Sequence, residues 1–370
     1  MRLTIRAFAA TLAAGLLLPA AATAADGDFV LQAGRVVTVE GETFAEGGSV
    51  FVSNGRIEDV RAGYVNPWGA EVRKAEDAWL LPGFVEAESQ GGLERGNEQA
   101  PNTPFVSVLD GLDPMDDYFT NLLRDGTTTV FVVPGDETLL GGKGLVLKPV
   151  GRTAEEMTIR TDAGLKVALA PRRGTSRMAQ LAELRGALTA ARGQEAREVV
   201  DDPDDAERSP RQRALSALLD GRVPAVLACD LPVDVVNAFA LMEEFGLTGF
   251  VTLGPNARRA LPLLAERGVP CVLPPDLEPL ERDPETGREV RRFLAAEARG
   301  AGVPVVVQAN ERSPYGMRSL WYQAAVAVSQ GLTVPEALRA VTLEPARVLG
   351  VDDRVGSIAK GKDANLVLWS

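Results

Sequence analysis

The sequence contains no histidine, and this absence excludes several kinds of functional site. A zinc site of the usual Cys and His ligands cannot form, because the chain offers two cysteines and no imidazole. A serine–histidine catalytic triad is excluded for the same reason. The residue count alone therefore excludes any metal site or catalytic mechanism that depends on an imidazole nitrogen.

Cysteine is also scarce. Cys229 and Cys271 both lie inside apolar runs that are typical of strands. An oxidising compartment would permit a disulfide between them. Buried thiols that pack as small hydrophobic side chains are the expected state.

Positive charge is in the minority, with 39 Lys and Arg against 51 Asp and Glu and a net charge of -12. No stretch is dense in Lys and Arg, so we expect no nucleic-acid partner and no binding to an anionic membrane by charge. Beyond the N-terminal region, no apolar run is long enough for a membrane-spanning helix.

The N-terminus has the three parts of a secretory signal peptide. Arg2 and Arg6 precede the apolar stretch AFAATLAAGLLLPAAA, and Ala22-Thr23-Ala24 forms an A-x-A cleavage pattern. We therefore predict that residues 1–24 are a signal peptide and that the mature protein is periplasmic or extracellular.

Both ends of the mature chain are rich in predicted strands. FVLQAGRVVTVEG and GGSVFVSNGRIEDVRAG alternate apolar and polar residues around turns such as Asn54-Gly55. The segment GSIAKGKDANLVLWS supplies a matching piece at the other end. We expect residues 26–79 and 351–370 to form one small β domain.

Between these ends, residues 80–350 alternate apolar strands with amphipathic helices, as in LKVALAP, VPAVLACD, GFVTLG, VPCVLPP and VPVVVQAN and the segments that follow them. This alternation predicts an α/β fold with a parallel sheet. About eight such units would close a (β/α)8 barrel, although an open doubly wound sheet has the same periodicity. Two segments depart from this rhythm: GDETLLGGKGLVLKPVG is predicted to form a loop and a hairpin, and the charged stretch 196–213 a solvated connection between helices.

Three segments resemble the amidohydrolase superfamily. LLPGFVEAESQGG (80–92) is similar to its opening motif, L-P-G-[FLI]-[IV]-D-x-H-x-H, and AVTLEPARVLG with GSIAKGKDANLVLW is similar to its closing signature. DGTTTVFVVPGDETLLGGKGLVLK resembles the exported imidazolonepropionase-like or dipeptidase-like branch. The resemblance implies a TIM-like (β/α)8 barrel with a β-sandwich made from both chain ends. The family chain usually continues beyond the position of Ser370, so we expect a smaller or truncated β domain.

The resemblance also implies a metal site at the barrel mouth. In the family, zinc or a similar divalent metal is held by histidines, an aspartate and often a carbamylated lysine, and it activates water for attack on a C–N bond. The positions that match the family ligands are Glu88 and Gln90 (the H-x-H motif), Lys148 (the lysine), Asp230 or Ala228 and Leu253 (the two later histidines) and Asn310 (the aspartate).

These replacements predict a catalytically impaired protein. Gln90 and Leu253 cannot replace imidazole as zinc ligands, and Asn310 has no useful proton-accepting pKa. We expect no cofactor, and an unknown small molecule or peptide as the partner.

Two alternatives stay open. One is an active hydrolase of non-peptide amides, cyclic amides or dipeptides. Its rebuilt site would consist of Glu88, Asp230 and Lys148, assisted by a Ca²⁺ or Mg²⁺ ion with oxygen ligands. The other is a structural subunit in a homo-oligomer or beside an active paralogue.

Overall fold

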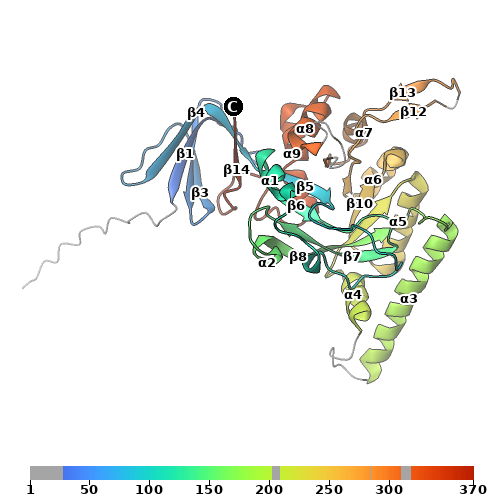
Figure 1. Cartoon of the computed structure of the whole chain (residues 1–370). Helices are drawn as coiled ribbons and strands as arrows, with labels where there is room; N and C mark the ends of the chain where they lie inside the picture. The colour runs from blue at the N-terminus through green and yellow to red at the C-terminus, as the bar shows by residue number, and fades with distance from the viewer. Residues whose placement is uncertain (1–27, 202–208, 284, 310–317) are drawn as a thin grey trace, which may run out of the picture.

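The structure is a computed structural model that describes residues 28–201, 209–283, 285–309 and 318–370 (Figure 1). It consists of a small β domain and a larger barrel domain. The predicted signal peptide, residues 1–24, lies outside the described residues, so export stays a prediction. Within the described ranges, no helix combines the length and apolar character needed to cross a membrane.

The β domain is a five-stranded sheet built from both ends of the chain, as predicted, with strand order β14-β4-β1-β2-β3. The strands are β1 (Phe29–Val36), β2 (Gly48–Ser53), β3 (Arg56–Ala62), β4 (Glu71–Pro82) and β14 (Leu366–Trp369). Asn54 and Gly55 have positive φ angles of 50° and 73°. These angles are those of the tight turn that joins two antiparallel strands, here β2 and β3. The Asn-Gly turn is therefore confirmed.

The barrel domain contains a seven-stranded sheet in the order β11-β10-β9-β8-β7-β6-β5. Its strands are β5 (Phe84–Ser89), β6 (Thr127–Val132), β7 (Leu140–Leu147), β8 (Thr158–Ala168), β9 (Ala225–Cys229), β10 (Gly249–Leu253) and β11 (Cys271–Val272). The segment 303–309, which forms no assigned strand, bridges the two edges of this sheet. The Leu273 amide donates to the Val306 carbonyl at 2.9 Å, and the Ala309 amide donates to the Glu86 carboxylate of β5.

The barrel interior shows that the sheet curls into a nearly closed ring. One buried cluster gathers Val85, Phe131, Val226, Phe250 and Val306 from different parts of the ring. The rings of Phe131 and Phe250 meet edge to face, with centroids 6.3 Å apart. An open doubly wound sheet would not bring these side chains into one cluster, so the prediction of a TIM-like barrel is confirmed.

The predicted hairpin is also present, and it changes the direction of one strand. β7 pairs antiparallel with both β6 and β8. Gly144 allows the close approach, because a Cβ atom there would lie 2.7 Å from the Val132 carbonyl oxygen. The ring is therefore not parallel throughout, and β7 begins at the end of the barrel where its neighbours finish.

The helices cover the outside of the barrel (Figure 1). They are α1 (Asp117–Arg124), α2 (Ala154–Met157), α3 (Arg177–Asp201), α4 (Pro210–Leu219), α5 (Pro232–Phe245), α6 (Leu261–Arg267), α7 (Leu294–Ala301), α8 (Leu320–Ser329), α9 (Val334–Ala340) and α10 (Leu343–Val348). The charged stretch 196–213 joins α3 to α4. Its ends belong to these two helices, and 202–208 lie outside the described residues.

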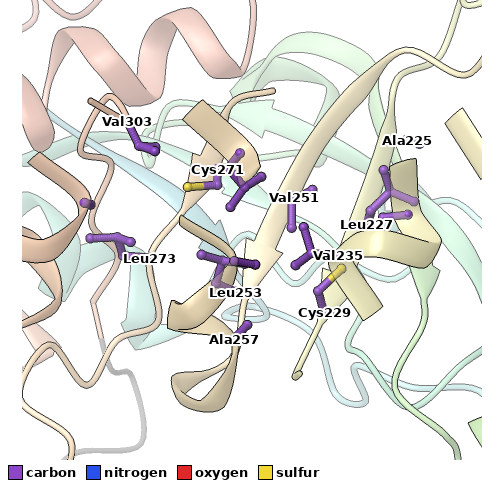
Figure 2. Packing of buried hydrophobic residues seen from close by; sticks show 14 of the residues in the cluster. Ala225, Leu227, Cys229, Val235, Val251, Leu253, Ala257, Cys271, Leu273 and Val303 are labelled. Carbon is purple, nitrogen blue, oxygen red and sulfur yellow. The ribbon is translucent and has the colours of Figure 1, made fainter. Parts of the chain in front are cut away.

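The two cysteines are buried and free, as expected. Figure 2 shows them on separate strands of the largest core cluster. Cys229 pairs with Leu253 of β10, and Cys271 pairs with Val251 of the same strand, so β10 lies between them. Two strand spacings, about 9.6 Å, exceed the reach of a disulfide. Burial raises the pKa of the Cys271 thiol to about 12, so it should be unreactive at neutral pH.

A charged cluster anchors the β12–β13 hairpin (Leu280–Arg282 and Glu289–Arg291) to the barrel. Glu281 accepts from Arg258, from Arg259 at 2.7 Å and from Arg292 at 2.8 Å. The hydrogen bond from Arg258 is the largest influence on the Glu281 carboxyl, and together the three guanidinium groups lower its pKa to about 2.

Replacing Glu281 with glutamine should therefore lower the free energy of unfolding by about 1–2 kcal/mol at pH 7, after allowance for solvent screening. The stabilisation from a carboxyl with a lowered pKa is present above its unfolded pKa and is lost as the pH falls toward the folded pKa. The difference between wild type and Glu281→Gln should thus shrink between pH 4.5 and 2 in urea unfolding. Glu285→Gln, at the exposed hairpin turn, is the control. A difference independent of pH would contradict the prediction.

Candidate functional site

A cavity of about 1040 Å³ opens at the barrel mouth, where the parallel strands end. Glu88 lines this cavity from β5, and Asp136 lines it from the loop after β6. Asp230, which directly follows β9, and Thr252 and Leu253, which end β10, also line it. In barrels of this kind, the side chains at the C-terminal ends of the strands form the functional site. This cavity is therefore the candidate site.

Lys166 of β8 provides the central positive charge of the site. Its side chain is fully buried, and its ammonium forms ion pairs with Glu88 and with Asp136, the latter at 2.7 Å. Glu88 is 12% exposed and Asp136 is 57% exposed, and both line the cavity. A buried ammonium is costly without such partners, so the two carboxylates account for its place in an apolar strand.

The pKa values of this group follow from its geometry. Burial is the largest influence on Lys166 and opposes its charge, but the carboxylates of Asp136 and Glu88 outweigh it and raise the lysine's pKa above its usual value. Burial, assisted by the negative charge of Asp136, raises the pKa of Glu88, while Lys166 opposes this shift. At neutral pH the lysine is therefore a fixed cation, and burial favours the protonated form of Glu88.

The structure brings most of the sequence-predicted residues together. Glu88, Gln90, Asp230 and Leu253 all line the cavity, as does Ala228, the alternative to Asp230. Asn310 lies outside the described residues. Asp230 is held in place by its neighbours: its amide donates to Asp234, and its carboxylate accepts from Asn256 at 3.4 Å.

Lys148 is not at the mouth, and the expectation that it would join Glu88 and Asp230 there is wrong. Its ammonium lies 2.9 Å from the Asp363 carboxylate, which also accepts from Arg354 at 2.8 Å. The cause is the direction of β7. Lys148 follows the C-terminal end of this antiparallel strand, where Leu147 pairs with Thr158 at the start of β8. That end of β7 is opposite to the mouth.

Sequence reasoning missed Lys166 and Asp136. The signal for Lys166 was present: it is the single charged residue in the apolar run GLKVALAP. A charge at a position that the strand pattern buries requires a partner, and buried paired charges gather at functional sites. Asp136 had no comparable signal, because an aspartate in a Gly-rich loop is common.

The residues at the mouth do not fit a zinc ion. Among the residues that the structure describes, no three His, Cys, Asp or Glu side chains lie close enough to hold a metal. Glu88 and Asp136 are both engaged by an ammonium, and burial raises the pKa of the Cys229 thiol well above its usual value. Zinc prefers imidazole and thiolate ligands, and neither is available here.

Comparisons with known proteins agree with this fold. The sequence model described as "Amidohydrolase family" matches residues 127–370, more than half of the chain. An amidohydrolase structure from Thermotoga maritima MSB8 superimposes with a TM-score of 0.82 at 28% identity, over 92% of this chain and 94% of that one. A zinc-bound adenosine deaminase from Xanthomonas campestris has a TM-score of 0.51 at 22% identity, over 92% of this chain and 84% of that one, and shares the fold alone.

Two kinds of curated relative match less completely. Imidazolonepropionase from Legionella pneumophila (strain Corby) is 35% identical over 71 residues, which are 19% of this chain and 18% of that protein. Amidohydrolase tasK from Hapsidospora irregularis is 26% identical over 87% of this chain, which corresponds to 38% of that protein. This chain therefore aligns with only a minor part of each of these relatives.

Proposed function

Because this chain belongs to the amidohydrolase family, we propose that it is a member with impaired hydrolytic activity, whose barrel mouth binds a small polar molecule without a transition metal. The observation that carries the proposal is the ion pair between Lys166 and Glu88. Glu88 matches the first histidine of the family motif, and here it binds a fixed ammonium of the same chain. The cavity and its polar wall remain and provide the binding site.

The proposal is tested by the metal content and activity of the purified mature protein. We expect no stoichiometric zinc, manganese or iron by elemental analysis, and no turnover of amides, cyclic amides or dipeptides after incubation with these metals. The adenosine deaminase from Xanthomonas campestris, whose structure contains zinc, is the positive control for metal retention. Stoichiometric zinc together with turnover would overturn the proposal.

One observation favours a second candidate, a hydrolase of C–N bonds with a rebuilt site. Glu88 is a buried carboxyl with a raised pKa in a cavity, which is the environment of a general acid or base. If Glu88 acts as a base, the rate should fall as the pH drops through its pKa. Turnover that is lost in Glu88→Gln and kept in Glu137→Gln, an exposed carboxylate of the same cavity, would support this candidate. Equal rates in both variants would remove it.

A further inference from the structure

The trio of Glu88, Lys166 and Asp136 arranges oxygen ligands around a positive charge. The two carboxylates come from the end of β5 and the loop after β6, and the ammonium comes from the neighbouring strand β8. Carboxylate oxygens around a central cation are also the arrangement that hard divalent ions adopt in proteins. Here the central cation is the ammonium group of the Lys166 side chain.

We propose that the Lys166 ammonium takes the place of a metal ion at the barrel mouth and prevents divalent cations from binding there. The carboxylates of Glu88 and Asp136 are each paired with it. A divalent ion bound to the same oxygens would lie within a few ångströms of the ammonium, and the two positive charges would repel each other at that distance. This inference goes beyond the proposed function, because it holds whether or not the mouth hydrolyses a substrate.

The same geometry argues against carbamylation of Lys166. A carbamate forms when a neutral amine attacks carbon dioxide and releases a proton, and it carries a negative charge. It would place a third anion beside Glu88 and Asp136, with Asp230 on the same cavity wall. Among the residues that the structure describes, Lys166 is the cation paired with Glu88 and Asp136, and conversion to a carbamate would remove that positive charge. The unmodified ammonium is the form that neutralises its neighbours.

Removal of the lysine should create a binding site for divalent cations. With Lys166→Ala, the two carboxylates lose their cation and gain the volume that the lysine side chain occupied. Gln90 and Thr252 line the same cavity and offer further oxygen atoms. The variant should then bind hard cations such as Ca²⁺, Mg²⁺ or Mn²⁺, which the wild type does not bind at this site.

The test is thermal unfolding of the full mature chain with increasing CaCl₂, MgCl₂ or MnCl₂, against NaCl at equal ionic strength, with calorimetric titration of each metal. We expect no metal-specific shift in the wild type or in Lys148→Ala, the matched control on the opposite end of the barrel. Lys166→Ala should show a saturable rise of several degrees, and Lys166→Ala/Glu88→Gln should lose it.

Lys166→Gln, which keeps more of the side-chain volume, is the second variant in case Lys166→Ala folds only with added metal. Folding that depends on added metal would itself support the proposal. Three results would overturn it: binding of the metals by the wild type at the mouth, no response of either folded Lys166 variant, or an equal response in Lys166→Ala/Glu88→Gln. None of these results depends on hydrolysis, so the proposal can fail while the proposed function stands.

Discussion

Replacing Lys166 with methionine is expected to lower the free energy of unfolding by about 3–5 kcal/mol, because it leaves the buried Glu88 carboxylate without its cation. Methionine has a similar volume, so the loss should report charge rather than a cavity. Lys148→Met is the matched control: the Lys148 side chain is 28% exposed, and its partner Asp363 keeps Arg354. We expect the control to lose about 1 kcal/mol or less.

The measurement is urea unfolding of the three proteins with chelator present, at several pH values. Lys166→Met/Glu88→Gln should recover part of the loss, since removing both charges is less costly than removing one. The loss should also shrink as the pH falls and Glu88 becomes neutral, because a carboxyl with a raised pKa is best accommodated when protonated. A Lys166→Met protein as stable as Lys148→Met would show that the ion pair contributes little.

A second large effect is expected at Asp234, which holds the wall of the cavity after β9. The Asp234 side chain is fully buried and accepts from the Leu231 amide at 2.9 Å and from the Arg177 Nε at 2.8 Å. It also accepts from the Asp230 amide at 3.2 Å. It therefore satisfies backbone groups at the start of α5 and neutralises a guanidinium.

Asp234→Asn should cost about 2–4 kcal/mol, since it removes the charge that faces Arg177 and weakens the cap of α5. Asp220→Asn, in an exposed pair with Arg222, should change stability by less than about 0.5 kcal/mol. Urea unfolding gives both values, and hydrogen exchange should show faster opening around residues 230–234 in Asp234→Asn alone. Similar losses in the two variants would contradict the role given to Asp234.

Much of the fold was predictable because its signals are local. The alternation of apolar strands and amphipathic helices predicted the α/β barrel, and the strand-rich chain ends predicted the β domain. Closure was not predictable from periodicity, since it depends on contacts such as that between Phe131 and Phe250, which lie far apart in the sequence. The interior of a barrel is formed only when the ring is complete.

The candidate site was predictable in part. The family motif indicated Glu88 and Gln90, which line the cavity, but it also indicated Lys148, which lies beside Asp363 instead. The spacing of GGKGLVLK contains no information on the direction of its strand, and the antiparallel course of β7 carries Lys148 away from the mouth. Lys166 could have been identified from its burial among apolar neighbours, because an unpaired charge at such a position would be too costly.

The pairing of β14 with β4 has a consequence for how the chain is made. β4 leaves the ribosome early, and β14 is synthesised only after the whole barrel. Until β14 is made, one edge of β4 is therefore unpaired. An unpaired strand edge can pair with strands of other chains. Folding that depends on such distant segments is slow.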